Sequence, residues 1–179
     1  MTAPKYTPGP ASGARIERKD GDEWTLVLVR ELRHPPKKVW DALTDPAQLR
    51  EWAPYDADGS LANVGATVKL TTVGAPAPHV TETKIKRADA PKVLEFAWGG
   101  RDVRWELEPK GKGTKLTLWA NIDRRYIAMG AAGWHLCLDV LDHALAGTPL
   151  GRMVGPDAMK VEGWRQLLAG YTKRFADDR

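Results

Sequence analysis

The sequence predicts an α+β fold in which an antiparallel sheet takes up most of the chain and a long helix lies near the carboxyl terminus. Apolar and polar residues alternate in successive segments from residue 67 to residue 122, and short turns separate them, which is typical of an antiparallel meander. The segment Ile127–Ala146 carries apolar residues at helical spacing instead. Strands and helices do not alternate along the chain, so a parallel dinucleotide-binding sheet is excluded.

The first expected element is a hairpin. The segments Ala14–Lys19 and Trp24–Arg33 flank Asp20-Gly21, a dipeptide that favours a tight turn between two strands. Residues 1–13 are rich in proline, glycine and alanine, and we expect them to form a flexible tail. They contain no apolar segment typical of a signal peptide or an anchor, so the sequence favours a cytoplasmic protein.

Two short helices are expected after the hairpin. Pro35 and Pro36 suit the first turn of a helix, because the missing N–H of proline costs little there. Thr44 and Asp45 end this helix, and Pro46 starts the next one. The apolar residues expected to face inward are Val39, Trp40, Leu43, Leu49 and Trp52.

The rest of the sheet is expected to follow these helices. Gly99-Gly100 and the segment Lys110–Gly113 predict hairpin turns between the last three strands. The expected strands lie near Thr67–Val73, His79–Arg87, Lys92–Trp98, Arg101–Glu108 and Thr114–Ile122.

The long helix is expected to have an apolar and a polar face, and Gly147 with Pro149 should end it. Its apolar stripe comprises Trp134, Cys137, Leu138, Leu141 and Leu145, and its polar face comprises His135, Asp139, Asp142 and His143. A loop, Thr148–Pro156, should then lead to a last amphipathic helix. The apolar residues of that helix are Val161, Trp164, Leu167, Leu168, Tyr171 and Phe175.

The composition fits one domain, which we place at residues 14–179. The chain has 179 residues, of which 42% are hydrophobic and 28% are charged, so it can bury a full core without disulfides. Its single cysteine, Cys137, agrees with a reducing compartment. The net charge is +4, but acidic residues are interspersed among the basic ones. We therefore expect no nucleic acid and no membrane as a partner.

The order of these elements resembles the START/SRPBCC superfamily, and in particular its branch similar to the activator of heat-shock protein 90 ATPase (Aha-type). The proline, VW, ALTDP, L and W pattern of that branch is present as Pro36, Val39-Trp40, Ala42-Leu43-Thr44-Asp45-Pro46, Leu49 and Trp52. Further matches are Val64-Gly65, Pro91–Trp98, Glu106–Pro109, Gly113–Leu118 and Gly133-Trp134. The resemblance implies a helix-grip fold, in which the antiparallel sheet wraps around the long carboxy-terminal helix.

Few residues carry a catalytic or metal-binding pattern. His135, Asp139 and His143 lie at positions i, i+4 and i+8 of one helix, and eight residues span about 12 Å of helix. One ion does not bridge that span, so we expect these residues to be exposed or paired with neighbours, without a metal. Cys137 lies on the apolar stripe, where a buried, inert thiol is expected. The sequence predicts no catalytic residue and no cofactor.

The tryptophans indicate a binding site. Eight tryptophans stand against two phenylalanines, and an indole joins a large apolar surface to one hydrogen-bond donor, which suits a pocket for an amphipathic molecule. Trp40 and Trp164 are expected to fill the core. The resemblance implies a cavity between the sheet and the long helix. The residues expected at its walls are Trp52, Trp105, Trp134, Cys137, Leu138 and Leu141.

Two classes of function remain open at this point. The resemblance implies the binding of a hydrophobic or amphipathic small molecule, and some members of the superfamily are cyclases or dehydratases. The alternative is a protein-interaction module similar to the chaperone ATPase activator, although the chain has no room for the additional amino-terminal domain of such activators. Both a monomer and a homodimer are left open.

Overall fold

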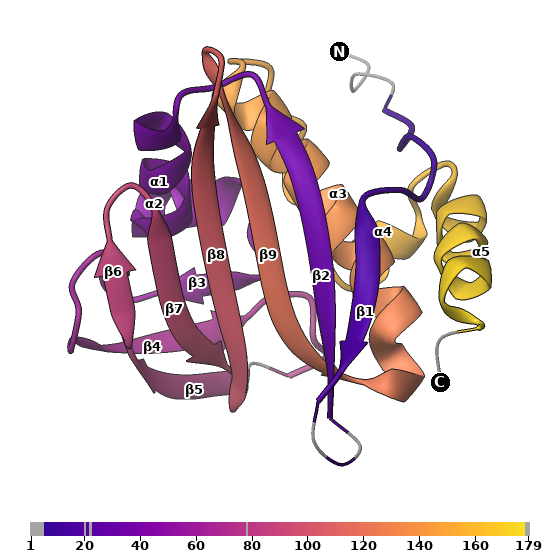
Figure 1. The fold of residues 1–179 in the computed structure, drawn as a ribbon, viewed down its shortest axis with the longest axis horizontal. Helices are drawn as coiled ribbons and strands as arrows, with labels where there is room; N and C mark the ends of the chain where they lie inside the picture. Colours follow the sequence, from indigo (N-terminus) through magenta and orange to yellow (C-terminus); the bar gives the residue numbers. More distant parts are fainter. Residues whose placement is uncertain (1–5, 20, 22, 78, 178–179) are drawn as a thin grey trace.

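The computed structural model describes residues 6–19, 21, 23–77 and 79–177. Six strands form an antiparallel sheet, and a long helix, α3 (Ile127–Leu145), lies across one face of it (Figure 1). A smaller sheet of three strands lies beside the larger one. The predicted α+β helix-grip fold, with a long helix near the carboxyl terminus, is confirmed.

The larger sheet begins with the predicted hairpin; Asp20 of its turn lies outside the described residues. Along the sheet, the strands are β1 (Ala14–Arg18), β2 (Glu23–Leu32), β9 (Gly113–Asp123), β8 (Arg101–Lys110), β7 (Val93–Trp98) and β6 (Arg87–Asp89). The smaller sheet contains β3 (Tyr55–Ala57), β4 (Thr67–Thr72) and β5 (His79–Lys84). The three residues of β3 are too few to give an alternating pattern, so the sequence did not predict that strand.

The single strand predicted at His79–Arg87 is wrong, because the structure divides this segment between the two sheets. Ile85 N donates to Ala66 O (2.9 Å) in continuation of the smaller sheet, whereas Lys86 N donates to Glu95 O (2.9 Å) in the larger one. The chain changes partner between these adjacent residues. The buried Ile85 side chain marks the crossing point.

The two short helices are confirmed as α1 (Pro36–Thr44) and α2 (Pro46–Trp52). Asp45 caps α2, since its Oδ1 accepts a hydrogen bond from Ala47 N (3.0 Å). Trp52 Nε1 donates to Ala42 O (3.0 Å) and ties the two helices together. All five apolar residues expected to face inward are buried.

Helix α3 is buried on more sides than the sequence predicted. His135, on the expected polar face, is only 4% exposed, and Leu136 and Val140 are fully buried. The cause is α5 (Trp164–Phe175), which packs against α3 beside strand β1 at the edge of the larger sheet (Figure 1). A 3₁₀ turn, η1 (Arg124–Tyr126), precedes α3, and the single-turn helix α4 (Pro156–Met159) follows the loop expected at Thr148–Pro156.

Residues 6–13, part of the expected flexible tail, lie against α5 and α3. A Cβ atom built on Gly170 of α5 would lie 2.9 Å from Ala11 Cβ, so the two segments are in close contact. At its other end the segment joins the sheet, where Val29 N donates to Gly13 O (2.7 Å). Arg174 Nε of α5 donates to Ala14 O (2.8 Å). The first described residues therefore hold α5 in place rather than extending away from the domain.

Candidate functional site

The middle of the interface between sheet and long helix is packed with aromatic rings. Trp105 of β8 lies between Trp52 of α2 and Trp134 of α3, with ring centroids 6.0 and 5.5 Å away and both pairs edge to face. Leu138 and Leu141 of α3 are fully buried in the same core. Side chains thus fill the space where the sequence analysis expected the central part of the cavity.

An open cavity of about 300 Å³ lies at the beginning of α3, beside the ends of β7 and β9. Met129 and Met159 are 45% and 57% exposed and stand at its mouth, whereas Trp134 and Trp164 are buried at its wall. We refer to it as the α3 cavity. Its lining residues are Pro54, Trp98, Ile122, Met129, Gly130, Gly133, Trp134, Cys137, Met153, Val154, Gly155, Ala158, Met159 and Trp164.

Two glycines of α3 give the cavity its floor. A Cβ atom on Gly130 would lie 2.4 Å from Ile122 Cδ1, so the absence of a side chain there lets β9 approach the helix. A Cβ atom on Gly133 would meet nothing within 4 Å. Glycine in the interior of a helix costs about 0.5–1 kcal/mol relative to alanine. At Gly133 the missing side chain leaves open space next to Trp134 in the cavity wall.

The far wall of the cavity belongs to the loop between α3 and α4. Arg152 holds this loop, because its Nη2 donates to Leu49 O (3.0 Å) and to Asp56 Oδ1 (2.6 Å). The loop also touches the turn after β4, where a Cβ atom on Gly155 would lie 2.4 Å from Gly74 O. Met153 and Val154, between these two attachments, face the cavity.

The wall of the α3 cavity carries no charge at neutral pH. Among the described residues that line it there is no Asp, Glu, His, Lys or Arg. The only thiol, Cys137, is buried, and burial raises the pKa of its thiol to about 12, although nearby Arg152 opposes this shift. Trp98 Nε1 donates to Thr72 Oγ1 (3.0 Å), so its polar end is satisfied within the protein.

The structure divides the six residues expected at the cavity wall into three groups. Trp134 and Cys137 line the α3 cavity. Trp52 and Leu141 border a separate depression of about 290 Å³, together with the polar residues Gln48 and Glu51. The remaining two, Trp105 and Leu138, line neither and belong to the packed core.

Most of the cavity wall was not predicted from the sequence. Half of its fourteen residues come from the segment Met153–Met159 and the two glycines of α3. The glycines were a usable signal, because glycine in the interior of a helix is unfavourable relative to alanine. The loop residues gave no such signal in the sequence, since their position depends on contacts with Leu49, Asp56 and Gly74, which are distant in the chain.

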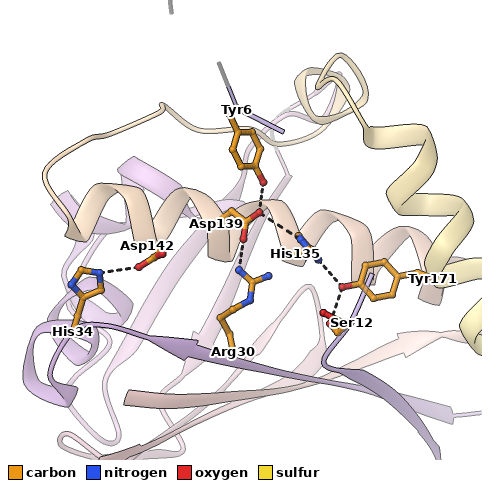
Figure 2. Close-up of polar contacts among 8 residues, drawn as sticks. All are labelled: Tyr6, Ser12, Arg30, His34, His135, Asp139, Asp142 and Tyr171. Carbon is orange, nitrogen blue, oxygen red and sulfur yellow. Dashed lines mark hydrogen bonds and ion pairs between the residues drawn. The ribbon is translucent and has the colours of Figure 1, made fainter. Parts of the chain in front are cut away.

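A second cluster, of polar side chains, lies on the other side of α3 (Figure 2). Asp139 accepts hydrogen bonds from Arg30 of β2 and from the hydroxyl of Tyr6. His135 Nε2 lies 3.5 Å from Asp139 Oδ2, and its Nδ1 lies 2.7 Å from the hydroxyl of Tyr171 on α5. These five residues, the polar cluster, join the amino-terminal segment, the sheet and two helices.

The polar cluster is a closed network. Burial lowers the pKa of His135, against the opposing effect of Asp139, so the ring favours its neutral form. With its proton on Nε2 the ring faces the Asp139 carboxylate, and Nδ1 is then free to accept from the Tyr171 hydroxyl. The amino-terminal segment covers this arrangement (Figure 2). We assign it a structural role.

His135, Asp139 and His143 each have a neighbouring side chain as a partner, as expected, since His143 Nδ1 lies 3.3 Å from Thr148 Oγ1. On the same helix, Asp142 bonds to His34 (2.9 Å). Among the residues that the structure describes, no three His, Cys, Asp or Glu side chains form a group that could hold a metal ion.

A wider depression of about 480 Å³ lies on the outer face of the larger sheet. Its charged side chains satisfy one another, because Arg104 pairs with Glu95 (2.6 Å) and with Glu106, and Lys86 pairs with Asp102. Arg104 also lies over the ring of Trp119 at 5.7 Å. This surface resembles the solvated face of an antiparallel sheet more than a binding site.

The fold and its apolar cavity define a helix-grip protein of the START/SRPBCC type. The family model described as activator of Hsp90 ATPase homolog 1-like protein matches residues 33–146, more than half of the chain. The chain therefore belongs to this family, as its sequence pattern predicted. No protein with a curated description matches it.

Solved structures agree with this assignment at the level of the fold. A conserved protein of unknown function from Enterococcus faecalis is 13% identical, with a TM-score of 0.69 over 93% of this chain and 92% of the other. A protein from Bordetella parapertussis is 25% identical, with a TM-score of 0.61 over 97% and 95% of the two chains. An AHSA1-like protein from Aeromonas hydrophila is 20% identical, with a TM-score of 0.55 over 69% and 94%. None of the described helices is long and apolar enough to span a bilayer.

Proposed function

We propose that this protein binds a small apolar molecule in the α3 cavity. The observation that carries the proposal is the open cavity of about 300 Å³ with an uncharged wall. Its volume lies at the lower end of the range of small-molecule sites, which are concave and mostly apolar. The proposal agrees with the ligand-binding role that the sequence resemblance implied, but it moves the site toward the beginning of α3.

The exposed methionines support a site that a ligand can enter. Met129 and Met159 lie on opposite elements, α3 and α4, and both are about half exposed. Large apolar side chains at the mouth of an apolar pocket are costly in water and useful where a ligand covers them. The unbranched thioether side chain also adapts readily to the shape of its partner.

An enzymatic role has less support. Acid–base and nucleophilic catalysis need a titratable group near the substrate, and among the described residues the cavity wall offers only the thiol of Cys137, which stays protonated at neutral pH. The buried imidazole of the polar cluster lies outside the cavity wall. Binding without catalysis is therefore the function that we propose.

Gly133 offers a direct test. A phenylalanine at this position would place its ring in the open space beside Trp134, so Gly133→Phe should abolish the saturable binding of the neutral fluorophore N-phenyl-1-naphthylamine. Gly133→Ala is the matched control, because a methyl group fits the same space. It should keep the binding and raise the free energy of unfolding by about 0.5–1 kcal/mol.

Circular dichroism and urea unfolding would show that both variants are folded. If the wild-type protein does not bind the fluorophore saturably, or if Gly133→Phe binds it as well as Gly133→Ala does, the cavity is not the binding site. In that case the interaction-module alternative takes its place.

A further inference from the structure

The wall of the α3 cavity has a distinct composition, because tryptophan and methionine supply six of its fourteen residues. Trp98, Trp134 and Trp164 come from three different elements, β7, α3 and α5. The rings of Trp98 and Trp134 already meet edge to face, with centroids 5.9 Å apart and an interplanar angle of 81°. Aromatic pairs favour this arrangement, and a third ring can continue it.

The methionines complement these rings. Met129, Met153 and Met159 come from α3, the following loop and α4, so thioether groups lie on two sides of the cavity. A sulfur atom close to an aromatic ring makes a favourable contact beyond ordinary apolar contact. An aliphatic ligand would not gain this interaction. A wall of this composition should therefore bind an aromatic ligand more tightly than an aliphatic ligand of equal hydrophobicity.

The volume of the cavity limits the size of the ligand. An apolar cavity of about 150 Å³ takes up one benzene molecule, and the α3 cavity has about 300 Å³. The space matches a ligand of about two rings. At Gly133 no side chain projects into the cavity, which leaves room for a ring to lie against the helix.

The uncharged wall selects against an ionised ligand. Transfer of an ionised carboxylate into an apolar site without a partner is strongly unfavourable. Arg152, the cation that acts on Cys137, is not among the wall residues. Asp56 and Leu49 O accept from its Nη2, whereas its buried Nε has no hydrogen-bond partner among the described residues. A charged group on the ligand would have to remain in water at the mouth, between Met129 and Met159.

From this composition we infer that the ligand of the α3 cavity is an uncharged, planar aromatic molecule of about two fused rings. This inference rests on the proposed function and gives it a ligand class. The rings of the ligand contact Trp98 and Trp134, and the thioether of Met153 lies against the ligand from the loop side.

The test compares three competitors that displace N-phenyl-1-naphthylamine at pH 7: 2-naphthol, which is neutral and aromatic; 2-naphthoate, which is an anion of the same ring system; and 1-heptanol, which is aliphatic and close to 2-naphthol in hydrophobicity. We expect 2-naphthol to bind at least about tenfold more tightly than 2-naphthoate because of the desolvation of the carboxylate. We expect it to bind about two- to tenfold more tightly than 1-heptanol.

Met153→Leu tests the origin of the aromatic preference. The substitution conserves volume and apolar character but removes the sulfur, so it should reduce the ratio of the affinities for 2-naphthol and 1-heptanol. Trp119→Leu, on the outer face of the sheet, is the control and should change neither affinity.

The outcomes separate this inference from the proposed function. If 1-heptanol or 2-naphthoate binds as tightly as 2-naphthol, the ligand class is wrong while the cavity remains a binding site. If the fluorophore itself does not bind saturably, both the class and the proposed function are wrong. An unchanged ratio of affinities in Met153→Leu would contradict the role of the thioether.

Discussion

His135 shows how the environment of one residue can make the stability of the whole protein depend on pH. In the folded protein burial lowers the pKa of this imidazole from its ordinary value of 6.5, whereas the unfolded chain takes up its proton near that value. Below pH 6.5 the unfolded state therefore binds more protons at this position, and folding is disfavoured. The contribution of His135 to stability is complete above pH 6.5 and falls as the pH decreases toward the lowered pKa.

We expect His135→Gln to weaken this pH dependence. The wild-type protein should lose part of its free energy of unfolding between about pH 7.5 and 5.5, and the variant should lose less, because its amide does not titrate in that range. Urea unfolding at the two pH values measures both losses. The other histidines are common to the two proteins, so an equal loss in both would show that His135 is not the cause.

At the scale of elements, one side chain, Arg152, links the loop between α3 and α4 to two distant parts of the domain. Arg152 bonds to Leu49 O at the end of α2 and to Asp56 of β3, and its side chain is 17% exposed. Arg152→Ala should reduce the free energy of unfolding by about 1–2 kcal/mol, since it removes the charge-assisted hydrogen bond to the partly exposed Asp56 and a second bond to Leu49 O, which still accepts from Ala53 N. It should also speed the release of a bound fluorophore, because Met153 and Val154 lose their support.

Lys160→Ala is a suitable control for the Arg152 prediction. Lys160 lies directly after α4 and pairs with Asp157 at 3.3 Å, but its side chain is 76% exposed. Exposed ion pairs contribute about 0–1 kcal/mol, so this variant should resemble the wild type in stability and in the rate of release. Stopped-flow release and amide exchange of the loop would measure the difference. If the two variants released the fluorophore at equal rates, Arg152 would not be the residue that holds the loop in place.

Elements whose bounds depend on residues that are neighbours in the chain could be predicted from the sequence. The ends of α1 and α2 follow from Pro36, Thr44, Asp45 and Pro46, and the alternating strands of the larger sheet were found near their true positions. The change of sheet at Ile85–Lys86 could not be predicted in this way, because it depends on which distant strand each residue meets.

For the docking of residues 6–13 a local signal did exist. Gly170 lies in the interior of α5, where glycine is less favourable than alanine by about 0.8–1.0 kcal/mol. The structure gives the reason, since Ala11 occupies the place of a Cβ atom at this position. A glycine within an amphipathic helix can thus mark the close approach of another segment, as it does at Gly130, where Ile122 approaches α3, and at Gly170.

For the molecule as a whole, the candidate site was only partly predictable. The sequence identified the tryptophans and the helix that carries the cavity, and it placed Trp134 and Cys137 among the wall residues. It could not indicate that Trp52, Trp105 and Trp134 pack against one another, because their mutual distances depend on the curvature of the sheet and the position of α2. Because those rings fill the interior between the sheet and α3, the open space that remains, the α3 cavity, lies at the beginning of the helix.

This central packing should control the stability of the whole domain. Trp105 is fully buried and joins β8 to α2 and α3 through two edge-to-face contacts. Trp105→Ala should therefore lower the free energy of unfolding by about 3–5 kcal/mol, which is the usual loss when a large buried aromatic side chain is removed. Because the three elements share this residue, circular dichroism and tryptophan fluorescence should still report one cooperative transition in urea, at a lower midpoint.

Trp119→Ala is the control for Trp105→Ala, since Trp119 lies on the adjacent strand β9 but on the outer face of the sheet, where Arg104 covers its ring. Its loss should cost about 1 kcal/mol, the scale of an exposed cation–π contact. If the two variants were equally stable, the aromatic core would not be the centre of the domain. The interior between the sheet and α3 would then be loose enough to admit a ligand at the position that the sequence first suggested, beside Leu138 and Leu141.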